Sequence, residues 1–487
     1  MTTSVQPSEM PVAGRRSECI LLVKPDGVEH VGHSDPPLGL LYLAAALREA
    51  GFPVAVADGF VVGRAGLEAA FSRLRPRLVG TTAMTPSRHR ALDFAAWVKA
   101  QDPAVTTVLG GPHPTIMWRQ LLQRYPQVDI CALGEGEDTL VEIARGEPLE
   151  SVAGLAYRRR GVAVRTRPRP PRPDLDSLPL PAWDLVDLTA YPPRPPAGAK
   201  IVDGLDLTRT PRVPIIFSRG CTGRCTFCSS WWVWRGWRHR SPENTLREIK
   251  LLYLRHGARH FAFEDDTFSA DSSAAAALCD AIVAERLPIA WFATTRVDCV
   301  DADLLARMRA AGCYGVSYGI ESASPAVLAA LGKDTDAAQA ERAIRLAKEA
   351  GLRVSCLLII GGPGESRGTL NETISLLRRA RPDDVGTVGS LWVFPGTRIY
   401  RDLKAAGVVN DDFWLGPEPY FPYPGPWSKQ DLAEFGEAIY RRRTLNLPRL
   451  VTGRARHALG RALRPHLKQT PGRALAAPAC RCSESVR

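Results

Sequence analysis

Short apolar runs alternate with helix-like stretches over residues 19–146. The stretch after the first run places Leu40, Leu43 and Leu47 on one helical face and stops at Gly51, a residue that suits a helix C-cap. Repeated strand–helix units with short loops predict an α/β fold, a doubly wound parallel sheet that binds ligands beyond the carboxyl ends of its strands. Its predicted strands are residues 19–23, 53–58, 78–82, 105–111 and 129–134.

A second alternation follows a Pro-rich and Arg-rich stretch at residues 158–199. Its predicted strands are residues 213–218, 260–264, 289–294, 315–320, 353–360 and 385–394. Six βα repeats are too few for a closed eight-stranded barrel, so they predict a partial (β/α)6 barrel with its chemistry at the carboxyl ends of the strands. The expected parts are a disordered N-terminus (1–17), the doubly wound domain (18–150), a connector (151–210), the barrel (211–400), a helical extension (401–447) and a basic flexible tail (448–487).

Composition and charge narrow the class of protein. With 487 residues, 45% of them hydrophobic, the chain can bury large cores. No window approaches the ~18 uninterrupted apolar residues of a membrane helix, and the N-terminus lacks a secretory signal, so we expect a cytoplasmic protein without a membrane partner. The net charge of +12 is concentrated in residues 158–172 and 448–487. Because the tail has no aromatic residue for base stacking, we expect no nucleic-acid partner.

The cysteines supply the most specific chemistry. Eleven cysteines without an export signal argue against a disulfide framework. Cys221, Cys225 and Cys228 stand at spacings that let three thiolates share one iron–sulfur cluster, with glycines allowing the tight loop. A zinc site would want a fourth ligand, and the nearest candidate, His239, stands eleven residues beyond the last cysteine without a partner. Three cysteines leave one iron open. Six others, in or beside apolar runs, are expected to be buried: Cys19, Cys131, Cys279, Cys299, Cys313 and Cys356.

This C-x3-C-x2-C loop after a strand, opening a run of βα repeats, resembles the radical S-adenosylmethionine (SAM) superfamily. The resemblance implies a [4Fe-4S] cluster whose open iron binds SAM, cleavage of SAM to a 5′-deoxyadenosyl radical, and an external low-potential donor of flavodoxin or ferredoxin type. It extends to FEDDTF at residues 263–268, to GIES at 319–322, to IGGPGE at 360–365 and to PGT with Tyr400. It places SAM against Phe227, Glu264, Asp265, Asp266, Gly319, Glu321, Gly362 and Gly364.

The first domain resembles the Rossmann-type cobalamin-binding domain of one large radical SAM class. The matching segments are PPLGLLYL (36–43), GGPHPT (110–115) and GEGE (134–137), whose glycines let the backbone approach a large ligand. The D-x-H-x-x-G motif that supplies a histidine to cobalt is absent, as in many of these relatives. The resemblance places cobalamin against Pro37, Leu38, Gly39, Thr82, Met84, Thr85, Gly110, Gly111, His113, Gly134, Glu135 and Gly136.

The resemblance therefore implies a cobalamin-dependent radical SAM methyltransferase. We expect it to methylate an unactivated carbon of a small or carrier-bound specialised-metabolite intermediate, as in antibiotic biosynthesis, by means of a 5′-deoxyadenosyl radical and methylcobalamin, and to act as a monomer. The alternative is a radical SAM dehydratase, epimerase or cyclase whose first domain transfers no methyl group. No catalytic residue is assigned. Trp234, Arg235 and Trp237 form a candidate wall for the substrate, and a hydrophobic flap over the cluster loop is the plainer interpretation of them.

Overall fold

The computed structural model describes residues 17–25, 35–195, 200–442 and 445. The chain divides into a compact unit at residues 1–443 and a second unit at 444–487. The expected disordered N-terminus, apart from Ser17, and the expected basic tail with Cys480 and Cys482 lie outside the described residues. No helix in the described ranges is long and apolar enough to cross a membrane.

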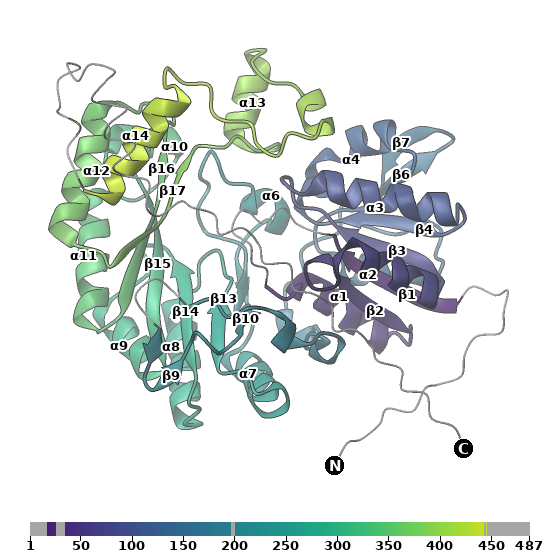
Figure 1. Ribbon diagram of the computed structural model, residues 1–487, viewed down its shortest axis with the longest axis horizontal. Coiled ribbons are helices and arrows are strands. Elements are labelled where there is room, and N and C mark those ends of the chain that lie inside the picture. Colours follow the sequence, from purple (N-terminus) through teal and green to yellow (C-terminus); the bar gives the residue numbers. More distant parts are fainter. Residues whose placement is uncertain (1–16, 26–34, 196–199, 443–444, 446–487) are drawn as a thin grey trace, which may run out of the picture. The chain divides into compact units, whose positions relative to one another are not determined.

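The first sheet has the doubly wound α/β architecture that the sequence predicts (Figure 1). Its strand order is β2-β1-β3-β4-β5-β6-β7, and the first five strands in the chain are parallel. These strands are β1 (Ser17–Lys24), β2 (Val54–Asp58), β3 (Pro76–Thr82), β4 (Thr106–Gly110) and β5 (Ile130–Ala132). The helices are α1 (Leu38–Glu49), α2 (Gly59–Leu74), α3 (Arg88–Gln101), α4 (Pro112–Arg124) and α5 (Glu137–Ala144).

Both faces of this sheet are buried, which explains why its strands read as continuous apolar runs. Alternate residues of β1 point to opposite faces. Leu22 packs in one core with Leu40 and Leu47 of α1, whereas Leu21 packs in another with Phe71 of α2. Gly51 also ends α1 as expected, because it follows the C-cap residue Ala50 with a φ of +86°.

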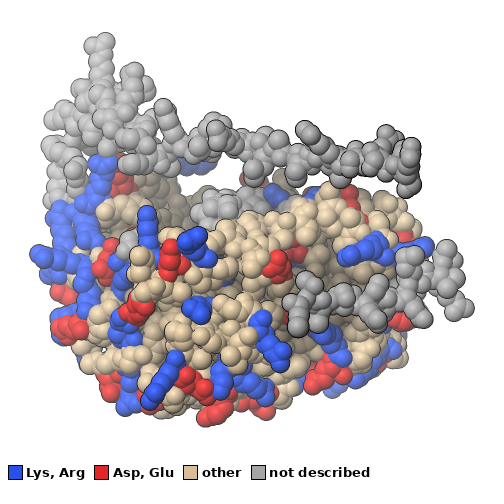
Figure 2. Space-filling model, turned by 60° about the horizontal axis from the view of Figure 1, so that its bottom comes forward, with Lys and Arg blue, Asp and Glu red and all other residues tan. Residues whose placement is uncertain are grey.

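A hairpin corrects the expected boundary at residue 150. β6 (Leu155–Arg159) pairs antiparallel with β5, and β7 (Val162–Arg165) pairs antiparallel with β6, so these residues belong to the sheet instead of a connector. The arginines here are also held in place. Arg158 donates to the carbonyls of Leu122, Tyr125, Pro126 and Val128 at and beyond the end of α4. The Arg-rich stretch is therefore not simply a solvated linker, and on the face in Figure 2 Lys and Arg are interspersed with Asp and Glu.

The second sheet is a six-stranded parallel sheet with the order β10-β13-β14-β15-β16-β17, the partial barrel expected from the sequence. Its strands are β10 (Arg212–Ile215), β13 (His260–Phe263), β14 (Ala290–Thr295), β15 (Cys313–Glu321), β16 (Arg353–Ile360) and β17 (Asp384–Ser390). Its helices are α7 (Pro242–His256), α8 (Ser272–Ala284), α9 (Ala302–Ala310), α10 (Pro325–Leu331), α11 (Ala337–Glu349) and α12 (Arg367–Ala380).

Smaller elements join and extend these sheets. Between them lie three 3-10 turns and a two-stranded hairpin of β8 (Ile201–Val202) and β9 (Leu205–Asp206). After β17 come α13 (Arg398–Ala405), a 3-10 turn at Asp411–Leu415 and α14 (Lys429–Tyr440), which contacts α12 and β17. Buried Arg88 of α3 ties the 3-10 turn to the first domain by donating to the carbonyls of Trp414, Gly416 and Glu418.

Candidate functional site: the cysteine loop and the cavity of the first sheet

The loop that carries the three cysteines is closed at its base by two short antiparallel strands. β11 (Ser218–Arg219) pairs with β12 (Arg238–His239), so the loop spans residues 220–237. Gly220 begins the loop with a φ of +90°, and a Cβ at this position would lie 1.8 Å from the carbonyl oxygen of Gly236. Only glycine fits this crossing of two backbone segments.

The three thiols suit a cluster better than a single metal ion. Cys221 Sγ accepts the backbone N–H of Gly223 at 3.3 Å, and Cys228 Sγ accepts that of Ser230 at 3.5 Å. Burial raises the pKa of Cys228 to about 12 against the effect of the Ser230 N–H, and the charge of Asp266 raises it further, with smaller contributions from Cys225 and Cys221. Among the described residues no three His, Cys, Asp or Glu side chains converge on one ion. A cubane fits, because each thiolate would bond a different iron.

The acids that follow β13 support the loop. Asp265 is 3% exposed, and both of its oxygens accept hydrogen bonds, from the backbone N–H of Phe217 at 3.2 Å and from the N–H and hydroxyl of Ser218. Burial raises the pKa of Asp265 to about 7, against the effect of these donors. The SAM contact expected of Asp265 from the resemblance stays a prediction. Asp266 accepts the Ser230 hydroxyl at 2.5 Å, and Glu264 lies 3.5 Å from Arg212.

A buried ion pair ends β15 beside the cysteines. Glu321 Oε1 lies 3.1 Å from Lys333 Nζ, and Glu321 has a φ of +63°, a strained value for a residue with a side chain. A Cβ at Gly319 would lie 2.9 Å from the Glu321 carboxylate, so glycine leaves room for the pair. The backbone N–H of Thr226, the residue after Cys225, donates to the carbonyl of Leu331 at 2.8 Å, so the segment that carries Lys333 lies against the cysteine loop. The motifs single out Glu321 and Gly319 but give no signal for Lys333.

The remaining residues expected near SAM occupy two places. Gly362 and Gly364 lie in the turn after β16, where a Cβ at Gly362 would come within 3.3 Å of Leu391 and Gly364 has a φ of +79°. Burial raises the pKa of Glu365, in the same turn, to about 7. Phe227 is half-buried against the apolar core that includes Leu391.

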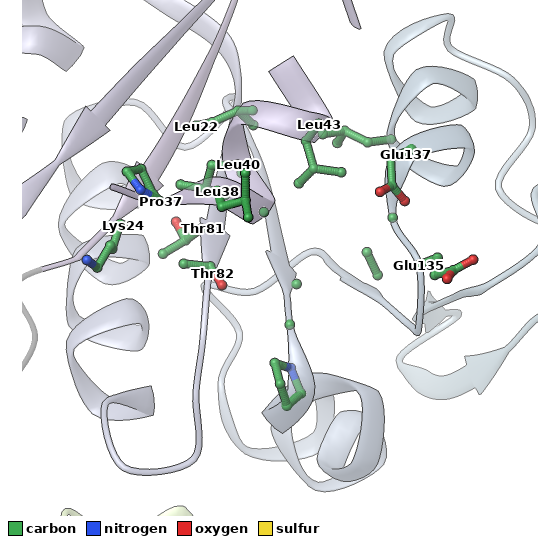
Figure 3. A pocket seen from close by; sticks show the side chains of 18 of the residues that line it. Leu22, Lys24, Pro37, Leu38, Leu40, Leu43, Thr81, Thr82, Glu135 and Glu137 are labelled. Carbon is green, nitrogen blue, oxygen red and sulfur yellow. The ribbon is translucent and has the colours of Figure 1, made fainter. Parts of the chain in front are cut away.

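A cavity of about 370 Å³ opens at the carboxyl ends of the first sheet (Figure 3). Figure 3 shows the carboxylates of Glu135 and Glu137 on one side of it and Lys24 on the other. At Gly39 and Gly134 a Cβ would meet no protein atom within 4 Å, so these glycines leave open space. Nine residues of the expected cobalamin site line it, namely Pro37, Leu38, Gly39, Thr82, Gly110, Gly111, Gly134, Glu135 and Gly136.

The floor of this cavity is apolar, and apart from Leu40 and Leu43 the sequence did not point to it. It runs along one face of the sheet between the strands and the helices α1 and α5, over Leu22, Gly80, Val108, Ala132, Leu40, Leu43 and Leu140. In the sequence these residues look like ordinary core. A corrinoid is larger than this cavity, so the glycine-rich rim and apolar floor fit part of one, such as a nucleotide tail.

Three residues expected at the cobalamin site do not line this cavity. Met84 is 53% exposed, and Thr85 is buried beside His113, with 3.2 Å between the Thr85 hydroxyl and His113 Nδ1. Burial, assisted by the Arg88 charge, lowers the pKa of His113 to about 3, so the ring is neutral. His113 therefore behaves as a core histidine in this structure.

The tryptophan-rich segment divides between the cavity and the loop. Trp234, in α6 (Ser230–Trp234), lines the 370 Å³ cavity, whereas Arg235 lines a smaller one of about 50 Å³ beside it. Trp237 instead donates its indole N–H to the carbonyl of Thr267 at 3.2 Å. Of the three residues in the candidate wall, only Trp234 thus faces the larger cavity.

Comparisons with known proteins agree with this geometry. Residues 215–377 match the radical SAM superfamily, and residues 26–144 match the B12 binding domain. An uncharacterised methyltransferase of Pyrococcus horikoshii, PH0819, is 32% identical over 79% of this chain and 82% of its own length. The anaerobic magnesium-protoporphyrin IX monomethyl ester cyclase of Cereibacter sphaeroides is 31% identical over 80% of this chain but only 64% of its own length, less than two thirds.

A solved structure shares the fold. The radical SAM methyltransferase TsrM of Kitasatospora setae, with cobalamin and a [4Fe-4S] cluster bound, superimposes with a TM-score of 0.64 at 23% identity, covering 80% of this chain and 79% of that one. The chain belongs to the radical SAM superfamily, in the class that carries an N-terminal B12-binding domain. It is an enzyme of the methyltransferase-like branch of that class, with a [4Fe-4S] cluster, SAM and cobalamin as cofactors and an external electron donor.

Proposed function

We propose that this protein methylates an unactivated carbon of a small or carrier-bound metabolite. One observation supports this most directly. Arg219, two residues before Cys221, and Trp234, six residues after Cys228, line the same cavity as the glycine turns of the B12-binding domain. The loop that would hold the cluster is thus part of the wall of the cavity that would hold part of the corrinoid, which favours a reaction chamber shared by SAM and the corrinoid.

The residues of the chain have positioning and shielding roles in this proposal. Cys221, Cys225 and Cys228 would hold the cluster, and the buried pair of Glu321 and Lys333 would face the amino-acid part of SAM. When bound, the cluster and SAM supply a carbon radical and cobalamin supplies the methyl group. Radical chemistry needs reacting atoms ~3–3.5 Å apart and a site without stray hydrogen donors, and the apolar floor and Trp234 favour such a site.

The test uses SAM with a deuterated methyl group. The cluster-loaded and cobalamin-loaded full chain, reduced anaerobically, is expected to transfer the label to its bound cobalamin and to release S-adenosylhomocysteine, measured by mass spectrometry without any substrate. A Cys221→Ala variant loaded with cobalamin controls for cluster-dependent steps. Unlabelled cobalamin in a fully loaded, SAM-cleaving protein would contradict methyl transfer.

Unlabelled cobalamin would favour the alternative, a radical SAM enzyme that transfers no methyl group. The cyclase of Cereibacter sphaeroides supports this alternative by its identity of 31% to this chain. We further propose a monomeric cytoplasmic enzyme of specialised metabolism, as in antibiotic biosynthesis, with a ferredoxin-type or flavodoxin-type donor.

A further inference from the structure

A buried ion-pair network joins the glycine turn of the B12-binding domain to the base of the cysteine loop. Arg219 Nη2 donates to Glu137 Oε1 at 2.6 Å, and Arg219 Nη1 lies 3.4 Å from Glu135 Oε1. Arg238 of β12 donates to the same Glu135 oxygen at 2.8 Å, while the backbone N–H of Arg172 donates to the other at 2.8 Å. Both strands that close the loop are therefore held by carboxylates from one turn.

These charges are removed from solvent. The side chains of Arg219, Glu135 and Glu137 are 5%, 8% and 9% exposed. Burial opposes ionisation of Glu137, but the charge and hydrogen bond of Arg219 outweigh it and hold the pKa of this carboxyl below its usual value. The desolvation cost of burying an ion pair is about as large as the attraction between its charges, so such a network adds little to the free energy of unfolding. It is better suited to holding the glycine turn and the base of the cysteine loop in one relative position.

The same residues form part of the 370 Å³ cavity of the first sheet. Arg219, Glu135, Glu137 and Trp234 all line it. The guanidinium of Arg219 lies 5.2 Å from the ring of Tyr42 in α1 and 5.4 Å from that of Trp234. Its Nε–H is buried and has no hydrogen-bond partner within the described part of the chain, so one donor remains for a ligand.

We propose that Glu137 and Arg219 are positioning residues that couple the two cofactor sites, so that assembly of the cluster strengthens corrinoid binding and the reverse. Cysteines held by one cluster restrict the loop, which preorganises Arg219 and Trp234 in the cavity wall. The coupling rests on the two cofactors of the proposed function and not on methyl transfer. By linkage, each cofactor must change the affinity of the other by the same factor.

The experiment measures this factor directly. The Kd of hydroxocobalamin for the full chain is determined anaerobically, before and after reconstitution of the cluster. We expect the cluster to tighten binding at least ~5-fold, the lower end of typical couplings. In Glu137→Gln, which keeps the size of the side chain but loses its charge, the ratio is expected to fall towards one. The electron paramagnetic resonance spectrum of the reduced cluster should likewise respond to cobalamin in the wild type and not in this variant.

Two further variants serve as controls. Glu248→Gln is the matched control, because Glu248 is fully buried and pairs with Arg240 but lines no part of the cavity. It should keep the wild-type ratio. Glu137→Asp, which retains the charge, should recover part of the coupling and serves if Glu137→Gln does not fold.

The outcomes separate the coupling from the function. A ratio of one in a wild type that binds cobalamin and labels it from SAM would overturn the coupling and leave the proposed function intact. A wild-type ratio in Glu137→Gln would also overturn it. A wild type that binds no cobalamin would overturn both.

Discussion

Replacing Gly220 with alanine tests whether the crossing at the base of the cysteine loop determines cluster binding. The new Cβ would lie 1.8 Å from the Gly236 carbonyl oxygen, whereas real Cβ atoms essentially never approach within 3.0 Å, so one backbone segment must move by at least 1.2 Å (3.0 − 1.8). The φ of +90° adds a backbone cost of ~1–2 kcal/mol for a residue with a Cβ. Cys221 is the next residue and is displaced when the Gly220 segment moves.

The assay is iron and sulfide content after anaerobic reconstitution, followed by SAM cleavage. Gly220→Ala is expected to fold with an unchanged circular dichroism spectrum, to lose most of its cluster, and to cleave SAM ~10²-fold more slowly, as expected for a misplacement of about 1 Å.

The matched control is Gly257→Ala, after α7. Gly257 also has a positive φ, of +65°, but a Cβ there would meet no atom within 4 Å, so this variant carries the backbone cost alone. It should keep wild-type iron content and SAM cleavage. If Gly220→Ala matched Gly257→Ala in both measurements, the steric reasoning would be refuted.

Three other predictions concern the first domain and the wall of its cavity. The pKa of about 3 at His113 means that the folded chain keeps the imidazole neutral. Below a pH of ~6.5 the unfolded chain binds a proton at His113 that the folded chain does not bind, so the free energy of unfolding falls by ~1.4 kcal/mol per pH unit towards pH 3. His113→Gln should remove this contribution from urea unfolding between pH 4 and 6; equal slopes would contradict it. Trp234→Ala should weaken cobalamin binding ~10-fold through lost aromatic contact, measured by titration, and an unchanged Kd would remove Trp234 from the wall. Arg88→Met leaves buried carbonyls without their donor and should lower the free energy of unfolding by at least ~3 kcal/mol, measured in urea; a loss under ~1 kcal/mol would show that water replaces it.

The sequence predicted both sheets because buried parallel strands are continuous apolar runs. It missed the hairpin of β6 and β7, whose strands are joined through three consecutive arginines and a glycine and are followed by prolines. Arg158 looks like a solvated linker residue in the sequence, yet it satisfies carbonyls at and beyond the end of α4. Only the tertiary structure supplies those acceptors.

The candidate site was predictable where backbone geometry determines the residue type. A side chain would fill the cavity at Gly39 and Gly134, which lie in the matched motifs, and would clash at Gly220, one of the glycines of the cysteine loop. The ion pair of Arg219 with Glu137 could not be predicted, because the two residues are 82 positions apart and neither has a local signature of the other.

The cysteines outside the loop also show where prediction from the sequence succeeds and where it fails. Of the six expected to be buried, Cys19 and Cys299 are only half-buried; Cys19 lies in β1, and Cys299 lies in the loop between β14 and α9.

Metal analysis of the anaerobically purified full chain, reconstituted with iron, sulfide and cobalamin, tests the central claim most directly. The wild type is expected to hold about four iron atoms and about one cobalt atom per chain. The variant with Cys221, Cys225 and Cys228 replaced by alanine is expected to lose the iron and retain cobalt. Iron retained by this variant would contradict a cluster held by the three cysteines. A wild type that takes up iron but no cobalt would contradict corrinoid binding in the neighbouring cavity.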